Sequence, residues 1–483
     1  MEKIVEIVSA NIESWPFIIL CIATGIYFSL RMRFFQVRYI RRMCRLLFRS
    51  KPSDSGISSF QAFMLALSGR VGTGNIVGVA TAIALGGPGA VFWMWVIAFF
   101  GAGTAYVEAA LAQVYKDKID GVYRGGPAYY ILKGIGNKYY AAAFAIVTIL
   151  SCGVMLPGLQ ANAISAAVQH SFGISPYFTA GAVIILLALI IFGGIRRIAK
   201  AAEIITPFMA VGYVLIALYV LATNYQHIPN MFMLIVKSAI GYHEVLGGIV
   251  GSAISMGVRR GLFSNEAGQG SAPHASAAAD VPHPANQGLV QAFSIYVDTL
   301  LVCSATAFMI LITGMYKIYD PSMNVVADGG SLPAGITYGP ENTQLAVDSV
   351  IPGFGSAFVA VALFFFAFTT IMSYYFQAES NIYYLYRNKP AGKSHPAINI
   401  LRCTILIFTY YTGVNEISLA WNMADIGVGL MAWFNLIAIL LMQGVAMKVF
   451  NDYETQIRQG VTIPRFNPDK LGIKDTDEWV TVN

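Results

Sequence analysis

Two polar, glycine-rich segments interrupt long apolar stretches of the chain, and their residue types suit a small charged ligand. They are residues 67–76 (LSGRVGTGNI) and residues 263–271 (FSNEAGQGS). Each is too polar and too rich in glycine for a continuous helix facing lipid, so the sequence predicts unwound backbone that lines a cavity or lies buried in protein. The helix half that begins after such a break presents N–H groups, which suit a carboxylate. The half that ends before it presents carbonyls, which suit a sodium ion or an ammonium group.

Four further polar side chains lie inside apolar stretches. Asp298 is an ionisable residue in an otherwise apolar helix, which makes it a candidate functional residue. Thr369 and Thr370 place adjacent hydroxyls in an aromatic-rich stretch, although a threonine in a membrane helix more often bonds its own backbone. Gln160 lies in the middle of a predicted helix, where its side chain is as well suited to a hydrogen bond between helices as to lining a binding site.

The overall composition is that of a membrane protein. Of the 483 residues, 56% are hydrophobic and 12% are charged, whereas a soluble protein carries about 25% charged residues. The apolar residues fall in blocks of about 20, the length that crosses a bilayer core of about 30 Å. We therefore predict an all-α integral membrane protein. Its eleven transmembrane helices are expected at residues 15–29, 60–85, 91–115, 139–168, 177–194, 202–222, 245–278, 290–315, 354–386, 398–411 and 418–450.

The distribution of charge predicts the orientation. Basic residues gather in alternate connections, at 31–51, 116–138, 196–200 and 387–393, whereas the connection 316–350 has one lysine. Because lysine and arginine favour the cytoplasmic side, we expect a multi-pass protein of the cell (plasma or inner) membrane, in contact with lipid, with its N-terminus outside and its C-terminus in the cytoplasm. The net charge of +6 comes largely from these flanks. No nucleotide-binding or zinc motif accompanies it, so nucleic acid is not an expected partner.

The predicted helices show an internal symmetry. With the first helix set aside, the other ten form two sets of five, and each set opens with a broken helix. Because five is odd, the second set enters from the opposite side, which makes an inverted repeat whose paired broken helices point to the binding site. The predicted organisation is an extra N-terminal helix and basic loop at 1–52, a first repeat at 53–223, a second at 224–450, and a cytoplasmic tail at 451–483.

Three stretches resemble a known family. Residues 86–95 (GGPGAVFWMW), 71–76 (VGTGNI) and 260–268 (RGLFSNEAG) are similar to the motifs of the sodium:alanine symporter family, also called the alanine or glycine:cation symporter family. The resemblance covers nearly all of the chain after the first helix. That family lies in the amino acid–polyamine–organocation superfamily and has the LeuT-like fold, so the inverted repeat is itself a feature that the resemblance implies.

The resemblance implies roles for individual residues, because the two breaks resemble the fold's two unwound helices. The expected substrate-binding residues are Thr73, Gly74, Asn75, Ile76, Gln160, Phe263, Ser264, Thr370 and Ser373; Gln160 is assigned from its mid-helix place alone. Thr369 and Thr370, with the carbonyls of Ser68 and Val71, resemble the sodium site shared across the fold. Asn75, Ser264 and Asp298 resemble the fold's other sodium site, and oxygen ligands suit a hard cation.

The charged residues within the predicted helices are interpreted as structural ion pairs or gate contacts, because such charges pair or face water. They are Arg70, Arg259, Arg260, Glu108, Glu266 and Glu379.

The expected activity is secondary active transport by alternating access, in which sodium or a proton moves with alanine or glycine, by a monomer without an organic cofactor. Two departures from the family bear on substrate size: residues 372–374 are Met-Ser-Tyr where Leu-Gly-Trp is usual, and Gln269 stands where methionine is common. A member whose main substrate is glutamine or another neutral amino acid is therefore the alternative. A channel is a more distant alternative, because the two closed breaks suit the capture of a zwitterion better than rapid conduction. An enzyme is not expected, since no HExxH, nucleophile elbow or clustered acid pair is present.

Overall fold

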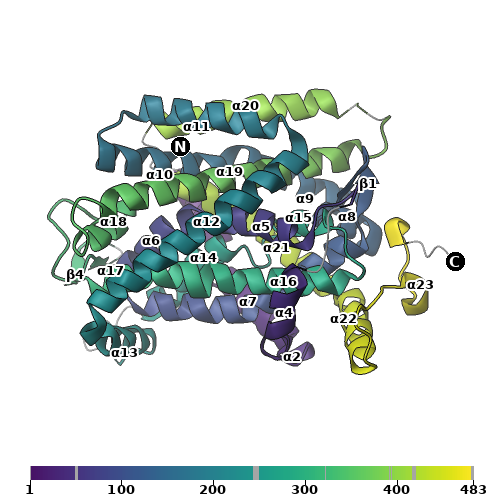
Figure 1. Ribbon diagram of the computed structural model, residues 1–483, viewed down its shortest axis with the longest axis horizontal. Helices are drawn as coiled ribbons and strands as arrows, with labels where there is room; N and C mark the ends of the chain where they lie inside the picture. Colours follow the sequence, from purple (N-terminus) through teal and green to yellow (C-terminus); the bar gives the residue numbers. More distant parts are fainter. Residues whose placement is uncertain are drawn as a thin grey trace.

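The computed structural model describes residues 2–48, 53–242, 250–320, 322–390, 392, 394–415 and 420–479. Figure 1 shows the long helices lying side by side in one bundle. Two antiparallel hairpins lie at opposite ends of this bundle, β1–β2 (Asp117–Ile119 and Val122–Arg124) and β3–β4 (Lys317–Tyr319 and Val325–Asp328). The predicted helix starts at 245 and 418, and the basic residues Arg49, Lys51 and Lys393, lie outside the described residues.

The helices of the first half are α1 (Glu2–Ile12), α2 (Trp15–Arg31), α3 (Phe35–Arg38), α4 (Ile40–Leu47), α5 (Ser59–Arg70), η1 (Gly74–Gly78), α6 (Val79–Gly86), α7 (Gly89–Val114), α8 (Pro127–Tyr130), η2 (Ile131–Ile135), α9 (Lys138–Leu150), η3 (Ser151–Met155), α10 (Leu156–Phe172), α11 (Pro176–Ile191) and α12 (Gly194–Thr223). Those of the second half are η4 (Tyr225–His227), α13 (Ile228–Ala239), α14 (Val250–Asn265), α15 (Pro273–Ala277), α16 (Pro284–Ile295), η6 (Tyr296–Cys303), α17 (Ser304–Ile312), α18 (Pro340–Asp348), α19 (Gly355–Tyr386), α20 (His395–Val414), α21 (Ala420–Leu441), α22 (Gln443–Arg458), α23 (Pro468–Leu471) and η7 (Asp477–Trp479).

Within the described residues, eight helical runs are long and apolar enough to cross a membrane, and the bent pair Ser59–Arg70 and Gly74–Gly86 makes up to nine. Two shorter helices of 16 residues each, α11 and α14, lie where two further spans are predicted. The chain is therefore a multi-pass membrane protein by composition and fold, while the number of eleven spans and the inverted repeat stay predictions.

One predicted span differs from the helices observed. The eleventh, 418–450, is wrong at its end, because α21 stops at Leu441 and Met442 has a non-helical backbone with φ −95° and ψ 8°. The following helix α22 carries Lys448, Asp452, Glu454 and Arg458 and belongs to the polar tail. The seventh, 245–278, is interrupted where the sequence predicts, since its helix ends at Asn265 and irregular turns lead to the short helix α15.

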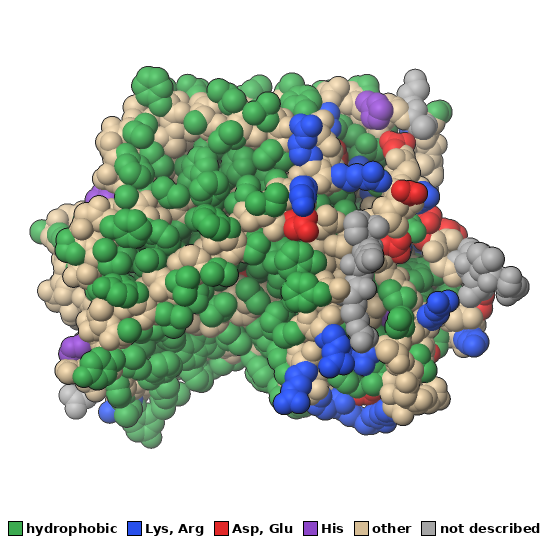
Figure 2. All heavy atoms as spheres, viewed as in Figure 1, with side chains coloured by type: hydrophobic (Ala, Val, Ile, Leu, Met, Phe, Trp, Pro, Cys, Tyr) green, Lys and Arg blue, Asp and Glu red, His purple; other side chains and the backbone are tan. Residues whose placement is uncertain are grey.

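The surface has the polarity of a protein embedded in lipid. Figure 2 shows hydrophobic side chains over most of one face, with lysine, arginine, aspartate and glutamate gathered toward the end that bears β1–β2 and α22. Exposed apolar side chains include Ile185 on α11 and Phe208 on α12, at 63% and 77% exposure. A soluble protein would bury such residues, so this belt is where the acyl chains of lipids are expected to lie.

Candidate functional site

The first broken helix has its break between Arg70 and Gly74, and its halves are bent by 52°. Val71 turns into extended backbone with φ −77° and ψ 91°, which ends α5. The freed N–H of Gly72 donates to the side-chain oxygen of Asn75 at 2.8 Å. Asn75, in the first turn of the restarting helix, therefore satisfies an N–H that lies ahead of this helix, as the glutamate or glutamine of a capping box does.

Gly74 has no side chain because the two broken helices touch at this point. A Cβ atom on Gly74 would lie 3.1 Å from a ring carbon of Phe263 and 3.2 Å from the Cα of Ser264. Gly72 is crowded in the same way by the Thr370 hydroxyl and by the Gln160 carboxamide oxygen. The structure thus brings together residues from both predicted breaks, and this close approach needs glycine.

The second break follows α14. Glu266, Gly268 and Gly270 all have left-handed backbone, with φ of 56°, 84° and 83°, and helical structure resumes at Pro273 in α15. The last carbonyl of α14, on Asn265, accepts a hydrogen bond of 2.7 Å from the Arg70 guanidinium. A cation at a helix C-terminus stabilises the unpaired carbonyls there, so Arg70 ties the end of one broken helix to the end of the other.

The carboxylate of Asp298 in η6 lies between the two breaks. It accepts 2.7 Å and 3.0 Å hydrogen bonds from the Asn75 amide and the Ser264 hydroxyl, and a 2.8 Å bond from Thr299. Cys303 lies 3.3 Å from the Asn75 amide nitrogen and 3.2 Å from the Ser264 oxygen. The three residues predicted for one cation position are therefore in mutual contact, and Asp298 is fully buried.

The Thr370 hydroxyl faces the first break, and the Thr369 hydroxyl does not. Thr370 Oγ1 lies 2.9 Å from the carbonyl oxygen of Ser68 and 3.3 Å from that of Val71. It also lies 3.0 Å from the carbonyl of Phe366 one turn earlier. Thr369 Oγ1 bonds the same Phe366 carbonyl at 3.0 Å, and this is the local bond expected of an ordinary membrane-helix threonine.

The remaining predicted residues lie around these two groups. The Gln160 carboxamide oxygen accepts from the backbone N–H of Thr73 at 3.0 Å and from its hydroxyl at 2.8 Å. Ile76 is fully buried. Ser373 Oγ lies 3.3 Å from the carbonyl of Leu65 and would be 2.8 Å from a Cβ on Gly69.

Several polar residues at the site were not predicted to belong to it. Arg70, Glu108 and Glu266 were expected to form ion pairs or gate contacts, and within the described residues none has an opposite charge within 4.0 Å. Arg70 instead bonds Gln291 at 3.1 Å and Ser294, and Glu108 bonds Asn435 at 2.8 Å. The sequence shows a charged residue inside an apolar stretch at each of these positions. The partners of Arg70 and Glu108, however, are uncharged groups from distant segments.

An aromatic pair and an ion pair cover the site on one side. The rings of Phe263 and Trp421 lie 5.4 Å apart, and the Arg260 guanidinium lies 4.7 Å from the centre of the Trp421 ring. Arg260 also pairs with Asp425 of α21 at 2.5 Å. Arg260 is buried, so this pair is shielded from water and holds the first turn of α21 over α14.

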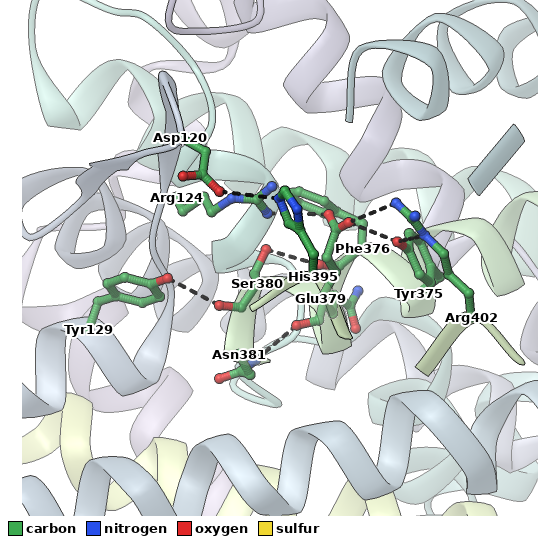
Figure 3. Close-up of polar contacts among 11 residues, drawn as sticks. Asp120, Arg124, Tyr129, Tyr375, Phe376, Glu379, Ser380, Asn381, His395 and Arg402 are labelled. Carbon is green, nitrogen blue, oxygen red and sulfur yellow. Dashed lines mark hydrogen bonds and ion pairs between the residues drawn. The ribbon is translucent and has the colours of Figure 1, made fainter. Parts of the chain in front are cut away.

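A second polar cluster lies two turns further along α19 (Figure 3). Glu379 accepts a 2.7 Å hydrogen bond from Tyr375 and pairs with Arg124 of β2 at 3.3 Å and with Arg402 of α20 at 3.7 Å. Asn381 bonds the ring of His274, which lies in α15 just beyond the second break, at 2.8 Å. The hairpin β1–β2 is thus fastened to α19 on the other side of the site.

The donor set suits a hard cation. In the part of the chain that the structure describes, no group of three His, Cys, Asp or Glu side chains could hold a metal ion. Carbonyl oxygens of Ser68 and Val71 with the Thr370 hydroxyl, and the oxygens of Asn75, Ser264 and Asp298, are instead the ligand types that sodium prefers over transition metals.

Comparison with known proteins shows the family. The chain matches the sodium:alanine symporter family over residues 1–468. It is 52% identical over 482 residues to YrbD of Bacillus subtilis (strain 168), with 99% of this chain and 98% of YrbD covered. It is 49% identical over 442 residues to the sodium/proton-dependent alanine carrier protein of Bacillus sp. (strain PS3), with 90% and 97% covered.

Among solved structures, the chain is similar to MhsT in complex with L-phenylalanine. The TM-score is 0.55 at 15% identity, with 88% of this chain and 96% of MhsT covered, so the likeness concerns the fold alone. The family resemblance carried by residues 71–76, 86–95 and 260–268 is confirmed. The chain therefore belongs to the sodium:alanine symporter family, whose members are membrane transporters and not enzymes, and it has the LeuT-like fold.

Proposed function

We propose that this protein carries alanine into the cell together with sodium, by alternating access. The observation that carries the proposal is the meeting of two unwound segments around oxygen atoms only: Thr370 Oγ1 against the carbonyls of Ser68 and Val71, and Asp298 against Asn75 and Ser264. Membership of a sodium:alanine symporter family and the 49% identity to an alanine carrier support the same substrate and ion. Glycine is a second substrate that fits the close approach of the backbone at Gly74.

The substrate carboxylate is proposed to bind the N–H groups that open η1, at Thr73, Gly74 and Asn75, with Ile76, Phe263 and Ser264 beside it. The Thr73 N–H is bonded to the oxygen of Gln160. An amide oxygen there occupies the kind of position that a carboxylate oxygen would take. We propose that Gln160 lines the site and rotates away, or shares the donors, when substrate binds. Thr370 and Ser373 are proposed to face the same site from α19.

Two cation positions are proposed. The first is formed by the carbonyls of Ser68 and Val71 with the Thr370 hydroxyl. Thr369 would have to leave its bond to Phe366 to join it, so it is the weaker member of this set. The second is formed by Asn75, Ser264 and Asp298. Because Asp298 supplies a negative charge, a proton is the alternative occupant of this second position.

The finer features of the transporter belong to the same proposal. The two five-helix units, 53–223 and 224–450, are proposed to be related as an inverted repeat around the site. The protein is proposed to work as a monomer in the cell membrane, with the N-terminus and the 316–350 connection outside and the tail from 451 in the cytoplasm. The hairpins β1–β2 and β3–β4 lie at opposite ends of the bundle, which supports opposite sides of the membrane for the two connections that contain them (Figure 1); the choice of the outer side rests on the basic residues.

Glutamine is the second candidate for the main substrate, in place of alanine. Gln269 lies in the second break, is 1% exposed, and neither polar atom of its side chain has a hydrogen-bond partner among the described residues. A buried unsatisfied amide costs free energy until a ligand pairs with it, and a substrate carboxamide would do so.

The test is uptake of labelled alanine into proteoliposomes with and without a sodium gradient, competed by glycine and glutamine. Saturable, sodium-dependent uptake that unlabelled alanine and glycine suppress is the expected result. Stronger competition by glutamine than by alanine would shift the assignment to the second candidate. Flux that does not saturate would favour a channel and overturn the proposal.

A further inference from the structure

The extra N-terminal helix places a carboxylate beside the ion pair that covers the site. Glu13 lies at the joint between α1 and α2 and is 2% exposed. One of its oxygens is 3.9 Å from the Arg259 guanidinium, which is beyond hydrogen-bonding distance and makes this a charge contact. Arg259 is followed directly by Arg260, the partner of Asp425.

Glu13 is held in this position by contacts with α21. The Trp433 indole N–H donates to the carbonyl of Ile12 at 3.0 Å. A Cβ on Gly429 would lie 3.6 Å from the Cγ of Glu13 and would collide with Ile12. Gly429 stands one turn after Asp425 on α21, so the joint between α1 and α2 packs onto the helix face next to the Asp425 pair.

These four side chains form the outer cluster: Glu13, Arg259, Arg260 and Asp425. The cluster contains two arginines and two acids, and Arg259, Arg260 and Asp425 all lie close enough to Glu13 to act on its charge. Burial makes charges costly unless they are paired. Without Glu13, the Arg259 guanidinium would lose its contact with the joint between α1 and α2, and Asp425 alone would face the two arginines.

We propose that Glu13 is a positioning residue of the outer gate, through which the extra N-terminal helix sets how readily Arg260 and Trp421 uncover the site. In the closed arrangement, Arg260 stacks on Trp421 and binds Asp425, and Glu13 faces Arg259 of α14 from the joint that packs on α21. Opening separates α21 from α14 and breaks the contact between Glu13 and Arg259, so Glu13 favours the closed gate. This inference rests on the proposed function in one respect, because the gate is proposed to control access to the same substrate site.

Gly78 offers a direct reporter of this gate. It is buried in η1, and a Cβ there would lie 3.9 Å from the Trp421 ring, which is ordinary contact distance. A Gly78→Cys substitution therefore places a thiol beneath Trp421 that a polar maleimide reaches only when the ring moves. The exposed Cys44 and Cys403 are replaced by serine in the parent protein to remove background labelling.

The experiment measures the rate of maleimide labelling of Gly78→Cys in purified protein, without substrate. Glu13→Gln should label about two- to fivefold faster than the parent, the range expected for losing an ion-pair contact. Glu6→Gln is the matched control, because Glu6 lies exposed on α1 and should leave the rate unchanged. If Glu13 acts through Arg259, the double variant Glu13→Gln/Arg259→Gln should label no faster than either single variant.

A second variant keeps the test decisive if Glu13→Gln is poorly folded. Trp433→Phe removes the indole bond to Ile12 and should also raise the labelling rate, because it loosens the same joint. Equal labelling rates for Glu13→Gln, Trp433→Phe and Glu6→Gln in well-folded protein would overturn the inference. Failure of the parent to take up alanine would instead count against the transport proposal, since labelling needs neither substrate nor uptake.

Discussion

The side-chain amide of Asn75 and the carboxylate of Asp298 are joined by a 2.7 Å hydrogen bond, although the two residues lie 223 positions apart in the chain. The Asn75 oxygen also accepts from the N–H of Gly72 at 2.8 Å, just ahead of the restarting half of the first broken helix. One side chain therefore connects the backbone of the break to the buried acid proposed as a cation ligand. A change in occupancy at Asp298 would reach the backbone at Gly72, which directly precedes the N–H groups proposed for the substrate.

Asp298→Asn should weaken sodium dependence, because an amide keeps the shape of the side chain but removes the charge. We expect the sodium concentration for half-maximal alanine uptake to rise by about tenfold or more, as for the loss of a charged hydrogen-bonding partner. Asp320→Asn, at a half-buried acid that directly follows β3, is the control. If Asp298→Asn instead removes only the pH dependence of uptake, the second position binds a proton.

Thr370→Val should raise the sodium requirement, whereas Thr369→Val should not. Valine keeps the shape of threonine and removes the hydroxyl, which lies near the Ser68 and Val71 carbonyls only in Thr370. Loss of a ligand worth about 1.5–3 kcal/mol corresponds to about ten- to a hundredfold, and weaker sodium binding must also weaken substrate binding at fixed sodium. Uptake across a sodium series checks this. Identical sodium curves for both variants and the parent would mean that Thr370 only bonds its own helix.

Gly74→Leu should abolish alanine binding, because its side chain would collide with Phe263 and Ser264, 3.1 Å and 3.2 Å from the new Cβ. Gly181→Leu is the matched control, since a Cβ at that helical glycine of α11 meets nothing within 4 Å. Both variants should insert and purify. Alanine binding to purified protein, measured by the sodium-dependent shift in melting temperature, should survive only in the control, and normal affinity in Gly74→Leu would place the site elsewhere.

His283 should make stability depend on pH. It lies before α16, where its ring accepts from the N–H of Ala285 at 3.1 Å and contacts Asp452 of the tail at 3.0 Å. Burial lowers the pKa of His283 from the ordinary 6.5, despite the opposing bond and charge of Asp452. The unfolded chain then takes up the proton more readily, so the contribution to stability is complete above pH 6.5 and is lost as pH falls below it.

We therefore expect the melting temperature to fall between about pH 7.5 and pH 5.5, with a loss of at most about 1.4 kcal/mol per pH unit from this residue. His283→Asn keeps a capping acceptor but does not titrate, so its curve should be flatter. His227→Asn, at an exposed position in η4, should follow the parent. A His283→Asn curve as steep as that of the parent would contradict the assignment.

The orientation is open to a labelling test on intact cells. A cysteine at Ser331, exposed between β4 and α18, should react with an impermeant maleimide, because the 316–350 connection is proposed to lie outside. A cysteine at Gln459, exposed after α22, should react only after the cells are made permeable. The opposite pattern would reverse the topology.

The sequence alone located much of what matters here. The two breaks could be found because glycine and polar residues at 67–76 and 263–271 are incompatible with a lipid-facing helix whatever their neighbours are. The membrane class follows from local composition in the same way, and the family from motifs that are local stretches. Such properties depend only on the residues of a short segment, so the sequence is enough to predict them.

Tertiary structure decided the rest, because it depends on which distant segments meet. Adjacent helical residues point about 100° apart, so only packing shows that Thr370 faces α5 while Thr369 bonds Phe366. For Arg70 the sequence left an ion pair and a gate contact open, and the structure shows a bond to a carbonyl 195 residues away. The end of α21 at Leu441 was missed, because averaged hydropathy runs smoothly into α22, and Glu13 joins the outer cluster only because α1 packs on α21. Such contacts are set by the shapes of surfaces far apart in sequence, which no local pattern contains.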